Sequence, residues 1–348
     1  MFALLSAGLG FCITVFGILL LRPLALRLGL VDTPDVRKQH QGNIPLIGGL
    51  AMLMGLLVGL LTLPISLQQY RSFIAGSALL VFVGFLDDFQ ELSAKSRFFA
   101  QIAAVLLMIF WGKVYITHLG NLFFLKNIHL GHYTSLIVTL IAGLGIINAI
   151  NMIDGVDGLA GTLVLIELIL LIFCAIITQH FSATTLLLLL VASVLGFLCF
   201  NFPFPGRYHA QIFMGDAGSM LLGFGLVWFL IELSQNNFRP ITPVTMCWIM
   251  SVPLFDATAV MLYRLIKGQS VVFSDRQHGH HLLLALKVSP LQINILFGST
   301  NFVLGLIGLC AFYYQFKESI MFMSFLLLFI IYFLVVNYCR NSLIKKTK

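Results

Sequence analysis

Charged side chains are scarce in this chain of 348 residues: Asp, Glu, Lys and Arg together make up only 9%, against 59% hydrophobic residues. The mean hydropathy is +1.01. A soluble domain of this length needs far more polar surface, so the composition excludes the soluble classes of protein. Apolar runs of about 20 residues instead predict a helical protein that crosses a lipid bilayer many times.

Paired cysteine spacings and a removable leader are also absent. The six cysteines lie in apolar runs, so we expect small buried hydrophobic side chains rather than disulfides or zinc ligands. No basic segment precedes the first apolar run and no small-residue cleavage site follows it, which favours a first membrane span over a signal peptide. Because no internal repeat or low-complexity linker divides the sequence, we expect one domain over residues 1–348.

Eleven apolar runs predict an all-α fold of about eleven transmembrane helices. Cytoplasmic loops carry the excess of Lys and Arg in membrane proteins, and this rule sets the expected orientation. With the N-terminus outside, 15 of the 20 basic residues lie on the inner side, all but Arg71, Lys113, Lys126, Arg239 and Lys317. The sequence therefore predicts an N-out/C-in polytopic protein. The predicted spans are residues 2–21, 46–66, 73–86, 98–116, 133–150, 159–178, 184–200, 217–233, 241–262, 291–314 and 319–339.

Six aspartates occupy positions that are costly at membrane depth and that therefore mark candidate functional sites. All nine aspartates of the chain lie on or near the predicted inner face. Loop polarity explains those in the longer inner loops, but not those at helix ends beside glycines. Carboxylates grouped in this way can hold a divalent cation against phosphate oxygens, which predicts a cytoplasmic active site for a phosphorylated substrate. The six are Asp87, Asp88, Asp154, Asp157, Asp216 and Asp256.

Each aspartate motif also has a simpler structural interpretation. The pair in FLDDFQEL is either a solvated helix end or, beside a cation, a ligand and its neighbouring base. Asp216 in FMGDAGS is a candidate helix cap, but convergence with the other aspartates favours a hard-cation ligand. The run NAINMIDGVDGLAG spaces four polar residues three apart, so a helix would place them on one face, and one cap would need only one carboxylate. These four are Asn148, Asn151, Asp154 and Asp157.

Two inner loops carry cationic candidates. The histidines and arginine of SDRQHGHHLLL suggest phosphate binding first, contact with anionic lipid headgroups second and a zinc site third. The loop DTPDVRKQHQGNIPLIGGL is either an ordinary positive-inside loop or an ordered loop that offers cations to phosphates. The candidates in these two loops are Arg37, Lys38, His40, Arg276, His278, His280 and His281.

Two carboxylates lie within predicted spans. Glu167 is either a polar residue of helix packing or an intramembrane carboxylate with a function. Asp256, nearer the inner end of its span, is expected to support the site from outside and to pair with Arg264. On the outer side the longest segment, residues 117–132, predicts a short hairpin without chemistry.

The ordered motifs resemble those of the polyprenyl-phosphate N-acetylhexosamine-1-phosphate transferase superfamily. The matching stretches run from residue 32 to residue 284: DTPDVRKQHQGNIPLIGG, FLDDFQELSAKSRFFAQ, NAINMIDGVDGLAG, FMGDAGSMLLG, PLFD and DRQHGHHLL. Gly279 interrupts the three consecutive histidines that are typical of the peptidoglycan branch. The chain therefore looks like the WecA-like branch, which starts O-antigen and related lipopolysaccharide or cell-wall glycans.

The resemblance implies an enzyme of the bacterial cytoplasmic membrane with its active site on the cytoplasmic face. The implied reaction converts UDP-GlcNAc and undecaprenyl phosphate into undecaprenyl-diphospho-GlcNAc and UMP, with Mg²⁺, or else Mn²⁺, as cofactor. The implied partners are these substrates and the lipid bilayer. No nucleic acid is expected, and a homodimer is compatible with the resemblance.

The resemblance also implies roles by motif position. Asp216 would be the direct metal ligand, and Asp87 and Asp88 would lie beside the metal and the lipid phosphate as catalytic residues and further metal ligands. Asn151, Asp154 and Asp157 would line the nucleotide-sugar pocket, with the two aspartates among the catalytic residues, and Asn148 is a further substrate-binding candidate. Phe213 would stack on uracil, the histidines His278, His280 and His281 would hold the diphosphate, and Lys95 and Arg97 would draw in phosphate.

Two questions stay open at the level of the sequence. Direct attack of the lipid phosphate on the β-phosphorus is preferred, because that phosphate is largely a dianion at neutral pH. The alternative mechanism makes one aspartate of the DD pair a covalent nucleophile. One alternative function is the same reaction with UDP-GalNAc or a peptidoglycan precursor. Secondary transport of an anionic solute is less favoured, because transporters usually show internal repeats and this sequence shows none.

Overall fold

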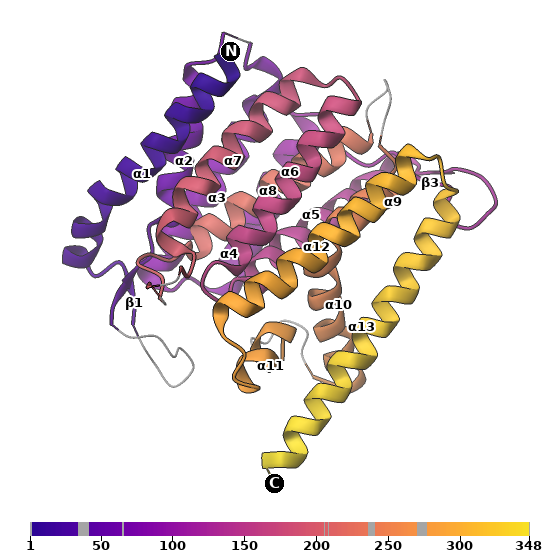
Figure 1. Ribbon diagram of the computed structural model, residues 1–348. Helices are drawn as coiled ribbons and strands as arrows, with labels where there is room; N and C mark the ends of the chain where they lie inside the picture. The colour runs from indigo at the N-terminus through magenta and orange to yellow at the C-terminus, as the bar shows by residue number, and fades with distance from the viewer. Residues whose placement is uncertain are drawn as a thin grey trace.

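A computed structural model describes residues 2–33, 42–64, 66–204, 206–207, 209–235, 241–269 and 277–347, with side chains as far as residue 342. The described residues are mostly helical, which confirms the all-α prediction (Figure 1). The elements are α1 (Phe2–Leu28), β1 (Val31–Asp32), β2 (Ile44–Pro45), α2 (Gly48–Leu61), the 3-10 helix η1 (Gln68–Tyr70), α3 (Arg71–Gln90), α4 (Ala94–Phe110), β3 (His118–Gly120), β4 (Ile128–His129), α5 (His132–Ile153), α6 (Leu159–Ile177), α7 (Phe181–Asn201), α8 (Gly215–Ser234), α9 (Pro243–Ile249), α10 (Ser251–Ile266), α11 (Gly279–Ala285), α12 (Pro290–Tyr313) and α13 (Glu318–Thr347).

Eight helices of the described ranges are long and apolar enough to cross a membrane, or nine if the bent pair α9–α10 is counted as one span. Each of the eleven predicted runs overlaps with a helix or with the bent pair. However, α2 has only 14 residues and α4 only 17, short of the roughly 20 that a span needs. The count of eleven is therefore not confirmed, and the N-out/C-in orientation stays a prediction.

The ninth predicted run is not one continuous helix. It breaks after Ile249, and α9 and α10 meet at an angle of 85°. Pro253 explains the break, because a proline has no N–H to donate to the carbonyl four residues earlier, which here is that of Ile249. Asn301 of α12 replaces the missing bond by donating to Ile249 O at 3.1 Å, and it also accepts the Val252 N–H at 3.0 Å.

The same asparagine is a hydrogen-bond partner of Glu167. This fully buried carboxyl accepts a hydrogen bond from Asn301 Nδ2 at 3.3 Å, in the middle of the bundle and away from the helix ends. Glu167 thus takes part in helix packing and joins α6 to the residue that holds the helix break, and whether it also has a function stays open.

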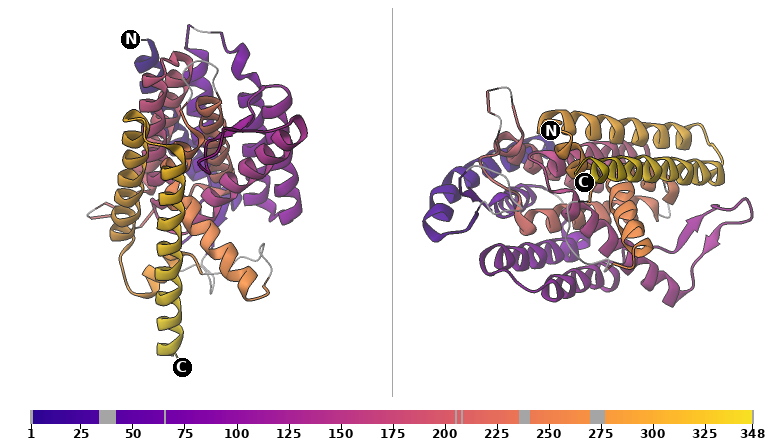
Figure 2. Two further views of the ribbon diagram at one scale, coloured as in Figure 1. Left: turned by 90° about the vertical axis from the view of Figure 1, so that its right-hand side faces the viewer. Right: turned by 90° about the horizontal axis from the view of Figure 1, so that it is seen from below.

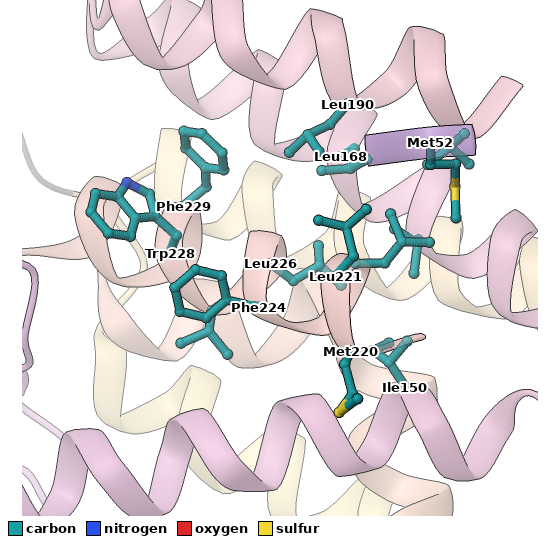
Figure 3. Packing of buried hydrophobic residues seen from close by; sticks show 14 of the residues in the cluster. Met52, Ile150, Leu168, Leu190, Met220, Leu221, Phe224, Leu226, Trp228 and Phe229 are labelled. Carbon is teal, nitrogen blue, oxygen red and sulfur yellow. The ribbon is translucent and has the colours of Figure 1, made fainter. Parts of the chain in front are cut away.

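The most buried helix of the bundle is α8. Figure 3 shows its apolar side chains, among them Leu221, Phe224 and Trp228, packed against residues of α2, α5, α6 and α7. Phe73 of α3 adds an aromatic contact, with its ring stacked on Phe224 at a centroid distance of 6.0 Å. In the apolar stretch of α8, 94% of the residues are buried, so this helix gives a rigid base to any residue at its first turn.

The two chain ends lie at opposite ends of the bundle (Figure 1). The end of the bundle near the C-terminus is here called the site end. It contains the C-terminal ends of α3 and α5, the N-terminal ends of α4 and α8, and α10 with α11 (Figures 1 and 2). A two-stranded hairpin, β3 with β4, lies at the opposite end and confirms the predicted hairpin of residues 117–132.

All six cysteines are free thiols, in agreement with the absence of paired spacing. The expectation that they are buried holds only for Cys174, since Cys247 and Cys339 are intermediate and Cys12, Cys199 and Cys310 are exposed. In a bundle of membrane-spanning length, apolar side chains on the helix surface can face lipid, so a cysteine in an apolar run need not face the protein interior.

Candidate active site

The end of α3 lies against the start of α8, and this contact positions the first two aspartates. The helices approach closely because Gly84 has no side chain: a Cβ there would lie 2.4 Å from the Ala217 main chain. One turn further along, α3 directs Asp87 and Asp88 toward the first turn of α8. The helix then ends at Gln90, and Glu91 adopts a left-handed backbone with φ of 50°.

Asp88 caps α8. Its Oδ1 accepts the Asp216 N–H at 2.9 Å, and its Oδ2 accepts the Ala217 N–H at 3.3 Å. A helix start leaves such N–H groups without an intrahelical partner, and negative charge is favourable there. Gly215 makes room for the carboxylate, since its φ is +70° and a Cβ would lie 2.3 Å from Asp88 Oδ2. Asp88 is therefore committed to holding the backbone of Asp216.

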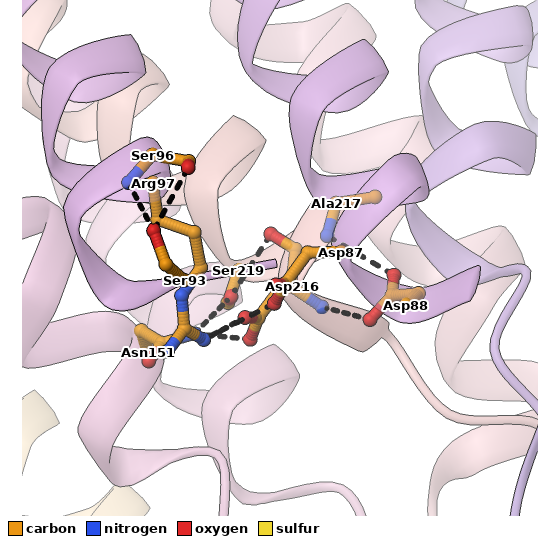
Figure 4. A network of polar contacts seen from close by, with 9 residues as sticks. All are labelled: Asp87, Asp88, Ser93, Ser96, Arg97, Asn151, Asp216, Ala217 and Ser219. Atoms are coloured by element: carbon orange, nitrogen blue, oxygen red, sulfur yellow. Dashed lines mark hydrogen bonds and ion pairs between the residues drawn. The ribbon is translucent and has the colours of Figure 1, made fainter. Parts of the chain in front are cut away.

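The carboxylates of Asp87 and Asp216 face the same guanidinium group, that of Arg97 (Figure 4). Arg97, in the first turn of α4, donates from Nη1 to Asp87 Oδ2 at 3.2 Å and also to Asp216 Oδ2. Asn151 near the end of α5 donates from Nδ2 to Asp216 Oδ1 at 2.7 Å and to Ser219 Oγ at 2.8 Å. Four helices thus bring two carboxylates, a guanidinium and an amide into one cluster.

This cluster suits a divalent cation that keeps substrate oxygens in its coordination shell. The described part of the chain holds no group of three His, Cys, Asp or Glu side chains arranged as a metal cage. Mg²⁺ seldom needs one, because one or two carboxylates usually bind it together with phosphate oxygens and water. Asp87 and Asp216 supply two hard oxygen ligands, and Arg97 shows that positive charge is accommodated between them. The residues present fit Mg²⁺ or Mn²⁺.

The loop between α5 and α6, residues 154–158, carries two further aspartates. Asp154 follows the last turn of α5 and has an exposed side chain. Surrounding protein atoms and the charges of Asp216 and Asp157 raise the pKa of Asp154 above its ordinary value. Asp157 Oδ2 accepts the Ala210 N–H at 2.8 Å and so ties this loop to the segment before α8.

The histidines form a second cluster against the same loop. His280 is fully buried and lies over Gly155, where a Cβ would be 2.4 Å from its Nε2. Its ring centroid is 4.2 Å from that of His281 and 5.5 Å from that of His278. Burial lowers the pKa of His280 to about 3, so this imidazole is neutral at physiological pH when no anion is bound.

Asp256 pairs with His278, so the expected pairing with Arg264 is wrong. The Asp256 carboxylate lies 2.7 Å from His278 Nδ1 and accepts the Gly279 N–H at 2.7 Å and the Tyr332 hydroxyl at 2.8 Å. Eight residues separate Asp256 from Arg264 on α10, which is about 12 Å along a helix and too far for an ion pair. The histidine segment reaches the aspartate instead.

Comparison with known proteins shows which family the chain belongs to. A family model described as glycosyl transferase family 4 matches residues 70–234. An undecaprenyl-phosphate alpha-N-acetylglucosaminyl 1-phosphate transferase of Escherichia coli K12 is 36% identical over 335 residues, covering 94% of this chain and 88% of the relative. Proteins of the same name from Yersinia pestis and Haemophilus influenzae are 36% and 35% identical over 91% and 90% of this chain and cover 86% and 88% of those relatives.

This chain belongs to the polyprenyl-phosphate N-acetylhexosamine-1-phosphate transferase superfamily. The family predicted from the motifs is thereby confirmed. The region that matches the family begins at Tyr70, directly before α3, and ends with the last residue of α8. It therefore contains the whole Asp87–Asp216 cluster.

The structure of this superfamily member brings five of the predicted site residues together. They are Asp87, Asp88, Arg97, Asn151 and Asp216, which all lie in the cluster at the site end, and their catalytic, binding and metal roles stay predictions. Four other candidates, Arg37, Lys38, His40 and Arg276, lie outside the described residues.

Three predicted residues lie away from the cluster contacts. Asn148 donates to Gln101 Oε1 at 2.8 Å and ties α5 to α4. The prediction that the polar residues of its run share one helical face is wrong, because α5 ends before Asp154 is reached. Lys95 is exposed at the start of α4, and Phe213 is half-buried with its backbone paired to the segment before α2. Uracil stacking by Phe213 stays a prediction.

Sequence reasoning missed the residues that hold the site in shape. Asn201 accepts the Gly158 N–H at 2.9 Å and donates to Ile212 O at 2.9 Å, which joins the loop of residues 154–158 to the segment before α8. Arg97 was predicted only as one of a pair that draws in phosphate, whereas it lies at the centre of the cluster. The signal for Asn201 was present, because it is a polar amide at the end of an apolar span.

Proposed function

We propose that this protein transfers GlcNAc-1-phosphate from UDP-GlcNAc to undecaprenyl phosphate and releases UMP. The proposal is carried by the Asp87–Asp216 cluster at one end of an apolar bundle, in a chain 36% identical to a transferase of that name over 94% of its length. The acceptor is held in the membrane and the donor comes from water. A site at the helix ends meets both requirements.

Direct displacement accounts for the reaction with the groups present. An oxygen of the lipid phosphate attacks the β-phosphorus of UDP-GlcNAc, the bond from that phosphorus to the bridging oxygen breaks, and UMP leaves with the electron pair. The lipid phosphate needs no strong base, since its second pKa is near 6. The transfer mainly requires positioning and charge neutralisation. A divalent cation held by Asp87 and Asp216 would supply that neutralisation at the diphosphate.

The protein groups have separate tasks in this scheme. Asn151 keeps the Asp216 carboxylate oriented, and Asp88 fixes the backbone that carries it. Arg97 lies between the two carboxylates and would donate to phosphate oxygens of the substrate, for which its forked geometry is suited. Both oxygens of Asp88 already accept backbone N–H groups, so Asp87 is the better candidate if the reaction instead runs through a covalent carboxylate.

We assign the site end of the bundle to the cytoplasmic side of a bacterial inner membrane, with the N-terminus outside. The excess of basic residues in the loops at this end supports the assignment, because such loops stay in the cytoplasm. Nucleotide sugars are cytoplasmic metabolites, and the product fits a first membrane step in the synthesis of O-antigen or a related glycan.

A donor comparison tests the reaction and identifies the sugar. Purified protein in detergent is incubated with undecaprenyl phosphate and UDP-GlcNAc, UDP-GalNAc or UDP-MurNAc-pentapeptide, and UMP release and the mass of the lipid product are measured. We expect UMP release that requires the lipid and a divalent cation, with UDP-GlcNAc preferred. Preference for another donor would keep the reaction class and change the sugar. Folded protein that releases no UMP with any donor would contradict the proposal.

A further inference from the structure

Asp256 is a buried carboxylate to which the proposed reaction assigns no task. It lies on α10 and is only 1% exposed, yet both of its oxygens are bound. Oδ2 faces His278 Nδ1 at 2.7 Å, while Oδ1 accepts the Gly279 N–H at 2.7 Å and the Tyr332 hydroxyl at 2.8 Å. Three donors around one carboxylate offset the cost of burying it, so the arrangement is a built pair and not a chance contact.

His278 has two ring nitrogens in different situations. Nδ1 is taken up by Asp256, and the ring lies nearly parallel to that of His280, at an interplanar angle of 14°. Nε2 makes no hydrogen bond within the described ranges, and it is not among the side-chain atoms that are closed off from solvent without a partner. A carboxylate on one nitrogen fixes the tautomer and the direction in which the other points.

The last helix braces this pair. Tyr332 of α13 holds Asp256, and Arg340, two turns further along, donates from Nη2 to the Gln277 carbonyl at 2.7 Å. The Arg340 guanidinium also lies 3.8 Å from the ring centroid of Tyr263 on α10. The histidine segment is thus held by α10 and α13 together at the site end (Figure 1). His280 of this segment also lies against Gly155 of the loop between α5 and α6.

We propose that Asp256 is a positioning residue, which holds His278 so that Nε2 is presented to the phosphate groups of the nucleotide donor. This inference rests on the proposed function. Asp256 touches neither substrate in this scheme and acts only through the imidazole. The competing explanation is that Asp256 merely fastens α10 to the histidine segment for stability, in which case its effect on turnover would be independent of His278.

A double-mutant cycle separates the two explanations. The values of kcat/KM for UMP release are measured for the wild type, Asp256→Asn, His278→Ala and the double variant, with the melting temperature of each. Asparagine preserves the size of the side chain but removes the fixed acceptor for Nδ1–H. We expect Asp256→Asn to lower kcat/KM on the order of 10²-fold, and to lower it less than threefold when His278 is already absent.

Two further variants guard against a folding artefact. Tyr332→Phe removes one donor to Asp256 and leaves the imidazole contact, so it should lower kcat/KM less than Asp256→Asn does. Asp256→Glu keeps a carboxylate and should recover part of the activity lost in Asp256→Asn at an equal or lower melting temperature.

The outcomes are distinct. Additive losses in the double variant, or an unchanged kcat/KM in Asp256→Asn, would overturn the positioning role. The proposed function would still stand in either case, provided that the wild type releases UMP. Absence of UMP release by the folded wild type would overturn both.

Discussion

The neighbouring residues Asp87 and Asp88 should respond differently when each is replaced by alanine. Asp88 holds two backbone N–H groups at the start of α8, whereas Asp87 faces the Arg97 side chain. Both variants should lose most of the activity, because one removes a phosphate-site carboxylate and the other the anchor of Asp216. Stability, not turnover, therefore distinguishes the two roles.

The expected magnitudes follow from these contacts. Asp88→Ala leaves two N–H groups without an acceptor, at about 1–3 kcal/mol for each buried group. Water reaches this half-buried position, so we expect a loss of about 2–4 kcal/mol. Asp87→Ala breaks an ion pair whose arginine is 35% exposed, and such pairs contribute about 0–1 kcal/mol.

Thermal unfolding in a single detergent measures the difference. Asp88→Ala should melt lower than Asp87→Ala by on the order of 5 °C, with UMP release recorded on the same samples. Asp88→Asn is the intermediate control, since its amide oxygen can still accept one of the two N–H groups. Equal melting temperatures for the two alanine variants would refute the assignment of Asp88 as the cap of α8.

Three other predictions concern a buried histidine, the helix break and the metal. Since the pKa of His280 falls from 6.5 to about 3 on folding, this side chain takes up a proton between these pH values only in the unfolded chain. The melting temperature should therefore drop as the pH is lowered from 7 to 5, and it should drop less in His280→Gln. Asn301→Leu leaves the Ile249 carbonyl and the Val252 N–H unpaired at membrane depth, so it should destabilise the protein by about 2 kcal/mol or more and an unchanged melting temperature would contradict this. EDTA should abolish UMP release, and Mg²⁺ or Mn²⁺ should restore it; activity that persists in EDTA would exclude the proposed metal role.

Much of the fold could be predicted because apolar runs of span length have few alternatives in a membrane protein. The helix positions followed from hydropathy, and the short hairpin followed from the polar interruption at residues 117–132. The shortness of α2 did not follow, since apolar character continues past the point where its helix ends at Leu61. The break after Ile249 was missed although Pro253 signals it, because the run remains apolar on both sides.

The candidate site divides in the same way. Carboxylates that end or begin an apolar span on one face had to converge, and this reasoning identified Asp87, Asp88 and Asp216. The partners within the cluster depend on how helices pack, which spacing along one chain does not reveal. Arg97 therefore appeared only as a basic residue near the site, and Asp256 was matched to an arginine on its own helix instead of to His278.

The central claim is that transfer takes place at the carboxylate cluster, and the most direct test is UMP release by the wild type beside Asp216→Asn. Asparagine keeps the size of the side chain and the capped backbone, so the variant should stay folded with a melting temperature close to that of the wild type. With UDP-GlcNAc, undecaprenyl phosphate and Mg²⁺, the wild type should release UMP and Asp216→Asn should release essentially none. Undiminished release by the folded variant would contradict the claim and move the chemistry away from Asp216.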